Sequence, residues 1–312
     1  MPTFNKQMLE VEAGKYGFRR DTFEKVVRLK RILEFMNSDE VLSNHLWLKG
    51  GTAINLTIFD FPRLSVDIDM DYTPNDEKAV MEETRQEIDR LLRDYMESEG
   101  YVLSDESRFM HSLDSYHYNY INAAGNNDMI KIELNYSLRA HILAPVMVNM
   151  IPRIFEEGFS VRTLDPMEIF ATKANALLNR AAARDLYDFS NMIDKGLFED
   201  KRDLFRKCIV FYASVSAPTI NKTFDTSEID RIDFAKIKRE LFPVIEVKAN
   251  FNLEGMKSKV KQYIANIMSL SPNEKEYLDR FESKEYMPEL LFENEIIINR
   301  IKEHPMVLWR CR

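Results

Sequence analysis

The sequence has few cysteines and no long hydrophobic run, and each absence excludes a class of protein. Two cysteines, Cys208 and Cys311, occur among 312 residues, too few and too far apart for a disulfide framework or a zinc knuckle. No apolar run approaches the roughly 20 residues that a membrane-spanning helix needs. The first residues lack the apolar core and cleavage pattern of a signal peptide. We therefore expect a cytoplasmic protein with no membrane partner.

Metal-binding histidine motifs and a strong basic charge are also missing. The five histidines show no H-x-x-x-H spacing, which argues against a helical zinc site. A net charge of −8 argues against a protein that coats nucleic acid non-specifically. The charge is uneven, because residues 201–312 carry +3 and residues 1–200 carry −11. The small excess in the last third is compatible with an RNA-contacting face.

The most informative motif is Lys49-Gly50-Gly51-Thr52, followed fifteen residues past Thr52 by Asp67-Ile68-Asp69. A glycine pair lets the backbone approach a phosphate closely. Side chains alternate along a strand, so a D-x-D segment in a strand places both carboxylates on one face. Glycines beside a triphosphate and paired acids beside a divalent metal are typical of a metal-dependent nucleotidyl transfer site.

Hydrophobic periodicity places these motifs in a mixed core of strands and helices. A C-terminal region with helical periodicity follows, and we expect a core over 1–195 and a helical domain over 196–312. The expected helices are 21–45, 52–59, 74–99 and 165–195, the expected strands are 46–48, 64–70, 101–122 and 128–138, and the expected breaks in the last region are Pro218, Pro243, Gly255, Pro272 and Pro288.

A third acid lies on a later strand. In Met129–Ser137, apolar residues alternate with Lys131, Glu133 and Asn135, so Lys131 and Glu133 share the polar face. Polymerase-like transfer uses two or three carboxylates on adjacent strands to hold one or two Mg²⁺ ions. Glu133 is therefore the candidate third ligand beside Asp67 and Asp69, and Lys131 is a candidate for a phosphate contact.

A second charged cluster occurs in ATKANALLNRAAARDLYDF, within the predicted helix 165–195. In an unbroken helix, Arg180, Arg184 and Asp188 fall on one face. Spacing alone favours a solvated helix with an Arg184–Asp188 pair worth a few tenths of a kcal/mol. The many alanines around this cluster favour close packing instead, and hence a functional face.

These motifs together resemble the AbiEii/AbiGii-type nucleotidyltransferases, which are toxins of bacterial toxin–antitoxin and phage-abortive systems. The resemblance covers roughly residues 20–195. Its basis is the run KGGTAINL…RLSVDIDM, then IKIELNYS, then EIFATKANALLNRAAARDLYDF. It implies an α+β fold with a polymerase-β-like nucleotidyltransferase core, a mixed sheet flanked by helices, followed by a helical C-terminal domain.

The resemblance also assigns residues to roles. It places Lys173 at the NTP phosphates and leaves open whether Asp185 or Asp188 enters the site. In full, the residues expected to bind the nucleotide are Gly50, Gly51, Thr52, Ser65, Lys131 and Arg180, those expected to be catalytic are Asp67, Asp69, Lys173, Asp185 and Asp188, and those expected to bind Mg²⁺ or Mn²⁺ are Asp67, Asp69 and Glu133.

Three functions remain open from the sequence. The first is transfer of an NMP from an NTP to an acceptor, which the resemblance suggests is the 3′ end of a tRNA, with a cognate antitoxin protein as partner. The second is NMP transfer onto a protein, either the chain itself or its antitoxin. The third is an NTP-binding interaction module without turnover, against which the intact Asp67 and Asp69 argue.

Overall fold

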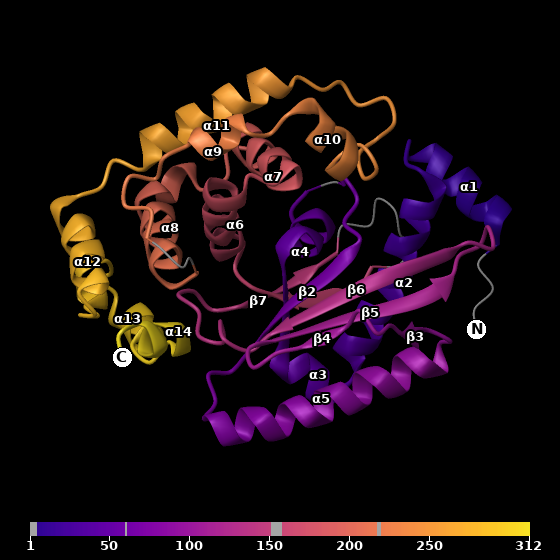
Figure 1. The fold of residues 1–312 in the computed structure, drawn as a ribbon, viewed down its shortest axis with the longest axis horizontal. Helices are drawn as coiled ribbons and strands as arrows, with labels where there is room; N and C mark the ends of the chain where they lie inside the picture. Colours follow the sequence, from indigo (N-terminus) through magenta and orange to yellow (C-terminus); the bar gives the residue numbers. More distant parts are fainter. Residues whose placement is uncertain (1–4, 60, 151–157, 217–219) are drawn as a thin grey trace. The chain divides into compact units, whose positions relative to one another are not determined.

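A computed structural model describes residues 5–59, 61–150, 158–216 and 220–312 (Figure 1). Contacts divide the chain into two compact units. The first comprises residues 1–139, 145–163 and 243–249, and the second comprises residues 140–144, 164–242 and 250–312. Residues 164–195 thus group with the second unit. The sequence-based boundary at residue 195 stays a prediction that differs from this grouping.

The first unit is a mixed sheet with helices, as predicted, and the described part of the second contains only helices. In the first unit the helices are α1 Lys6–Lys15, α2 Arg20–Ser38, α3 Glu40–His45, α4 Gly50–Thr57 and α5 Lys78–Ser98, and the strands are β1 Leu46–Lys49, β2 Asp67–Tyr72, β3 Val102–Leu103, β4 Arg108–Phe109, β5 Leu113–Ile121, β6 Asn127–Asn135, β7 Val146–Asn149 and β8 Ser160–Thr163. In the second unit they are α6 Pro166–Arg180, α7 Ala183–Asp194, η1 Glu199–Lys201, α8 Arg202–Ser216, α9 Ser227–Asp230, α10 Phe234–Glu240, α11 Leu253–Ile267, α12 Pro272–Glu282, η2 Pro288–Leu290, α13 Glu295–Ile301 and α14 Pro305–Arg310.

The strand order is β3-β5-β6-β2-β1-β8-β7, with β4 paired to β5. Strand β2 lies at the centre, antiparallel to β1 and parallel to β6. The hairpin β5–β6 turns at residues 122–126, as the cluster of small and polar residues there predicts. The acids predicted on β2 and β6 therefore lie on neighbouring strands.

The two faces of this sheet differ in polarity. Tyr116, Tyr118 and Tyr120 of β5 point to the covered face and are buried, and the Tyr116 hydroxyl donates to Asp89 of α5 at 2.8 Å. These tyrosines form core, as expected for the commoner role of such an alternating set. The opposite face carries the polar residues of β2 and β6.

Local signals explain where the long helices begin and end. Helix α5 buries Met81, Ile88, Leu92 and Met96 along one side, which is the spacing of an amphipathic helix. It ends before Gly100, whose φ of +78° lies in the left-handed region that favours glycine. The helix expected from residue 74 begins at Lys78, because helix boundaries follow capping geometry more than hydrophobic pattern.

The predicted helix over 165–195 is interrupted, which corrects the expectation of one continuous face for Arg180, Arg184 and Asp188. Helix α6 ends at Arg180 and α7 begins at Ala183. Between them Ala181 has a φ of +48°, a left-handed conformation that is costly for alanine. Helix α10 stabilises this corner, since Lys236 donates to the Arg180 carbonyl at 3.3 Å and Glu240 accepts from the Ala183 N–H at 3.2 Å.

The breaks expected in the last region are partly confirmed. Pro272 and Pro288 begin α12 and η2, and Pro243 lies between elements. The break expected at Gly255 is wrong, because Gly255 lies in the first turn of α11 and its N–H donates to the capping Asn252 side chain at 2.9 Å. Pro218 lies outside the described residues.

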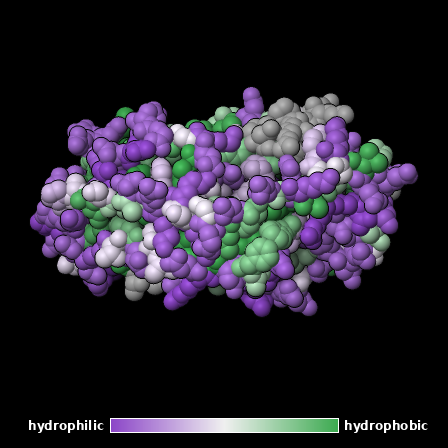
Figure 2. Space-filling view, turned by 90° about the horizontal axis from the view of Figure 1, so that it is seen from above, coloured by the Kyte–Doolittle hydropathy of each residue, from purple (hydrophilic) through white to green (hydrophobic). Residues whose placement is uncertain are grey.

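Hydrophilic residues cover much of the face drawn in Figure 2, with hydrophobic residues in patches between them. In the described ranges, no helix has both the length and the apolar character needed to cross a membrane.

Glu168 of α6 holds the short segment 140–144 in the second unit. Its carboxylate is fully buried and accepts from the Ile142 N–H at 2.7 Å, the Leu143 N–H at 3.0 Å and the Tyr212 hydroxyl at 2.5 Å. Burial raises the pKa of Glu168 to about 7, although all three hydrogen bonds oppose that rise. A folded pKa above the ordinary value of 4.5 means that this group contributes most stability at low pH and that the contribution is lost as pH rises through 7.

We expect Glu168→Gln to lower the free energy of unfolding at pH 5 by about 1–3 kcal/mol. The amide NH2 group only donates, so it would face a donor at one of the two oxygen positions that now accept the backbone N–H groups. The difference between the variant and the wild type should narrow as pH rises from 5 to 8, because only the wild type ionises at this position. Urea denaturation at several pH values measures both quantities. A difference that widens with pH contradicts the assignment.

Candidate active site

The glycine loop joins β1 to α4, and its first glycine lies against an acid of β2. Gly50 has a φ of +69°, in the left-handed region where only glycine is unstrained. A Cβ atom at Gly50 would lie 2.5 Å from the Asp69 carboxylate oxygen Oδ2. Both the backbone conformation and the space therefore require glycine here, and the loop backbone lies against the Asp69 carboxylate.

The second glycine makes room for two polar side chains. A Cβ atom at Gly51 would lie 2.6 Å from Arg63 Nη2 and 2.9 Å from Ser65 Oγ. Ser65, predicted to bind the nucleotide, thus lies directly beside the loop. The Thr52 hydroxyl donates to the Asp67 carbonyl and Thr52 is 1% exposed. In this structure the Thr52 side chain ties the start of α4 to β2.

The N-terminus of α4 has the features of an anion site. Its cap residue Lys49 makes no capping hydrogen bond from its side chain. The first N–H groups of a helix have no partners within that helix and carry partial positive charge. They lie in the segment that contacts Asp69, so the loop presents anion-binding groups next to a potential cation ligand.

The acid cluster comprises Asp67 and Asp69 of β2 and Glu133 of β6. In the parallel register of these strands, Asp67 lies opposite Lys131 and Asp69 lies opposite Glu133. Lys131 Nζ lies 2.8 Å from Glu133 Oε1. The structure therefore brings the three predicted metal ligands and Lys131 together.

The electrostatics of this cluster indicate an excess of negative charge. Burial raises the pKa of Asp69 to about 6, with a further contribution from the negative charge of Asp67. Burial also opposes ionisation of Glu133, but the hydrogen bond and charge of Lys131 outweigh it and lower the pKa of Glu133. Crowded carboxylates of this kind fit a bound cation, which would relieve their repulsion.

The donor set fits Mg²⁺ or Mn²⁺, since these ions prefer carboxylate oxygens. Within the described ranges, no three His, Cys, Asp or Glu side chains already stand in an arrangement that holds a metal ion. Glu133 is turned toward Lys131 instead. Metal binding by all three acids would thus require Glu133 to exchange this ion pair for the metal.

Two features of the site were missed by sequence reasoning. Ser115 of β5 lies opposite Glu133 and contributes to lowering the pKa of its carboxyl group. Lys49 pairs with the buried Asp71, the next polar position on β2 after Asp69. The D-x-D-x-D alternation of 67–71 signals Asp71, whereas Ser115 becomes visible only when the β5–β6 register is known.

The lysine cluster of the second unit comprises Lys173 of α6 with Asp185 and Asp188 of α7. Lys173 Nζ lies 2.6 Å from Asp185 Oδ1 and 2.9 Å from Asp188 Oδ2, and all three side chains are buried. Arg180 Nη2 reaches Asp185 Oδ2 at 3.2 Å, while its side chain is 69% exposed. Burial disfavours ionised Asp185, but Lys173 and Arg180 outweigh it and hold its pKa below the ordinary value.

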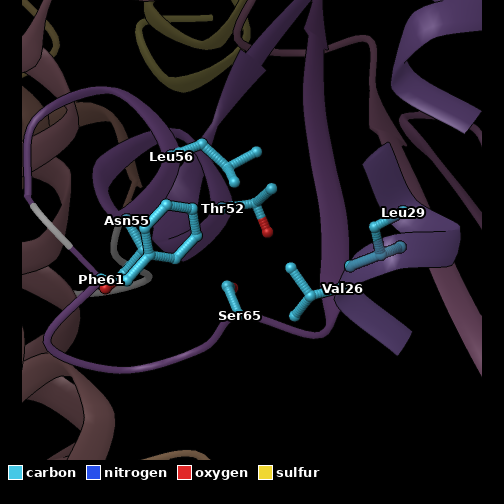
Figure 3. Close-up of a pocket in the computed structure, with 7 residues that line it drawn as sticks. All are labelled: Val26, Leu29, Thr52, Asn55, Leu56, Phe61 and Ser65. Carbon is cyan, nitrogen blue, oxygen red and sulfur yellow. The ribbon is translucent and has the colours of Figure 1, made fainter. Parts of the chain in front are cut away.

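A small apolar cavity lies behind the glycine loop, between α2 and α4 (Figure 3). Its lining consists of Val26, Leu29, Thr52, Asn55, Leu56, Phe61 and Ser65. It has room for about one water molecule, so it is a packing gap and not a nucleotide pocket.

Comparisons with solved structures identify the fold. The nucleotidyltransferase toxin MenT4 from Mycobacterium tuberculosis H37Rv aligns over 96% of this chain and 99% of its own, with a TM-score of 0.65 and 14% identity. At that identity the likeness shows a shared fold. CdnC from Escherichia coli MS115-1, solved with ATP, aligns over 97% of this chain and 98% of its own at 12% identity, but its TM-score of 0.24 carries no argument. No curated protein sequence matches the chain.

The family comparison covers most of the sequence. The family described as "Nucleotidyl transferase AbiEii toxin, Type IV TA system" matches residues 31–280. This range contains the glycine loop, the acid cluster and the lysine cluster. The chain therefore belongs to the AbiEii family and is a nucleotidyltransferase of a toxin–antitoxin system, with an NTP as substrate and a cognate antitoxin.

Proposed function

We propose that this nucleotidyltransferase transfers an NMP from an NTP to the 3′ hydroxyl of a tRNA, with Mg²⁺ or Mn²⁺ as cofactor. The acceptor oxygen forms a bond to the α-phosphorus, the bond from that phosphorus to the β-phosphate oxygen breaks, and pyrophosphate leaves. The observation that supports this most is the contact between Gly50 and Asp69. It sets phosphate-binding backbone beside cation-binding carboxylates, which is what an NTP–metal complex requires.

In this proposal Asp67, Asp69 and Glu133 hold the metal. When bound, the metal neutralises charge on the phosphates and orients the reacting oxygens. One carboxylate of the acid cluster accepts the proton of the acceptor hydroxyl.

The glycine loop binds the triphosphate mainly through its backbone. Gly50, Gly51 and Thr52 offer the N–H groups at the start of α4, while the Thr52 hydroxyl keeps the loop against β2. Ser65, beside Gly51, adds a hydroxyl donor. Lys131, now paired with Glu133, would be able to contact a phosphate if Glu133 were to bind the metal.

The lysine cluster contributes positive charge. We assign Lys173 to the triphosphate and Arg180 to the nucleotide, as the resemblance implies. Asp185 and Asp188 hold the Lys173 ammonium in place, which keeps it charged although it is buried. Whether either aspartate itself meets the substrate stays a prediction.

A tRNA acceptor, a cytoplasmic location and a part in phage defence extend the same proposal. The resemblance suggests the acceptor, and the positive net charge of residues 201–312 is compatible with it. NMP transfer onto a protein is the competing outcome, which the first experiment separates.

Asp67→Asn should reduce nucleotide transfer at least about a hundredfold, because a cation ligand is lost from the site of developing charge. The measurement is incubation with total RNA, Mg²⁺ and each labelled NTP in turn, followed by separation of RNA from protein. Asp94→Asn, a change at an exposed surface carboxylate, is the control and should keep full activity.

The same variant should also differ from the wild type in its unfolding temperature when no metal is present. Asp67→Asn should unfold at a slightly higher temperature than the wild type in EDTA, because the negative charge of Asp67 repels Asp69. Mg²⁺ should stabilise the wild type more than the variant. Full transfer by Asp67→Asn would rule out this mechanism, and label on protein alone would replace the tRNA acceptor with a protein acceptor.

Gly50→Ala should abolish transfer, whereas Gly125→Ala should leave it unchanged. Both glycines have positive φ, +69° and +86°, so each alanine should cost about 1–2 kcal/mol of stability. The methyl group added at Gly50 would meet the Asp69 carboxylate. The methyl group added at Gly125 would meet no atom within 4 Å. Urea denaturation and the transfer assay on both variants separate strain from the contact with Asp69. Equal activity of the two variants would contradict this role of Gly50.

A further inference from the structure

Helix α10 and the end of α6 carry an exposed aromatic ring among cations. Phe234 is 51% exposed at the start of α10. Lys238 and Arg239 on the same helix are exposed, and Arg180 at the end of α6 is 69% exposed. With Lys236, we call this set the α10 platform.

Two contacts tie α10 to the corner between α6 and α7. Lys236 Nζ donates to the Arg180 carbonyl at 3.3 Å, which ties α10 to the end of α6. Glu240 accepts from the Ala183 N–H at the start of α7. Helix α10 and the end of α6 are therefore neighbours in the folded unit, although more than fifty residues separate them in the sequence.

The Phe234 ring is braced. It meets the Phe242 ring edge-to-face at 5.6 Å, and Phe242 in turn meets Phe251 at 5.8 Å. Lys238 Nζ lies 5.1 Å from the centroid of the Phe234 ring. An exposed ring held in one orientation loses little entropy when a second flat group stacks on it.

The nearby carboxylates are already engaged. Asp233 caps α10 by accepting from the Lys236 N–H at 2.7 Å. Glu240 accepts from the Ala183 N–H and pairs with Arg239 at 2.9 Å. Asp185 pairs with Arg180 at 3.2 Å. Four cations thus stand beside three carboxylates that already have partners, and the platform keeps a small positive balance in an acidic protein.

We propose that the α10 platform binds the single-stranded end of the acceptor RNA. This inference rests on the proposed function for the acceptor class. Single-stranded nucleic acid offers phosphates and flat bases together, which match a cation and an aromatic ring placed side by side. An acidic peptide would match the cations and leave the Phe234 ring without a flat partner.

The affinity of the full chain for RNA can be measured without catalysis, by leaving out NTP. The readout is the fluorescence anisotropy of a short labelled single-stranded RNA. Phe234→Ala should weaken binding about tenfold, as expected for loss of one base stack. The matched control is Phe109→Ala, because Phe109 is 47% exposed and has an arginine, Arg93, at 5.0 Å from its ring. It should bind RNA like the wild type.

The charge contribution has a separate readout. Lys238→Gln with Arg239→Gln should lower the slope of log affinity against log salt by about 1.4, since each phosphate contact on a single strand contributes about 0.7. A polyphosphate chain, which has no bases, is the second probe. It should bind Phe234→Ala as well as it binds the wild type and should lose affinity only for the double variant.

In the transfer assay, Phe234→Ala should raise KM for RNA and leave KM for NTP unchanged. RNA binding that depends on Phe234, with label appearing only on protein, would sustain the α10 platform and overturn the proposed acceptor. RNA labelling with equal RNA affinity in wild type and Phe234→Ala would sustain the proposed function and overturn the α10 platform. If Phe234→Ala lost affinity for polyphosphate and for RNA to the same extent, the loss would not come from base stacking. That result would indicate a folding defect in the variant and would also overturn the α10 platform.

Discussion

The contact between the Gly50 backbone and the Asp69 carboxylate is the constraint on which the rest of the first unit depends. A loop that passes this close to a carboxylate leaves no space for a side chain. The antiparallel register of β1 and β2 sets Lys49 opposite Asp69, so the loop begins where the acid pair lies. The Thr52 hydroxyl and the Asp67 carbonyl then hold α4 against the same strand. Anion-binding and cation-binding groups are thereby fixed by one strand pair.

The lysine cluster and the acid cluster differ in how they compensate the free-energy cost of burying charged side chains. In the lysine cluster, two carboxylates share one ammonium and Arg180 pairs with Asp185, and removal of one partner from such a group typically costs about 3–5 kcal/mol. In the acid cluster, carboxylates crowd together and the pKa of Asp69 rises to about 6. The first arrangement stabilises the fold in the absence of ligand. In the acid cluster the carboxylates repel one another, and a bound cation would relieve this repulsion. Sites that carry function often lower the stability of the fold in this way.

Sequence reasoning identified the features that depend on local pattern. The alternation of 129–137 predicted that Glu133 and Lys131 share a face, and the structure places both opposite the acids of β2. It could not predict that Glu133 pairs with Lys131, or that Ser115 lies opposite Glu133, because these positions depend on the register of three strands. The roles of these residues in catalysis stay predictions.

The interruption at Ala181 shows why pattern alone failed elsewhere. Alanine is the best helix former, so NRAAARD predicts a continuous helix. Helix α10, which lies more than fifty residues later in the chain, satisfies the freed ends through Lys236 and Glu240. Tertiary contacts thus override a strong local propensity, and the same contacts bring α10 beside Arg180.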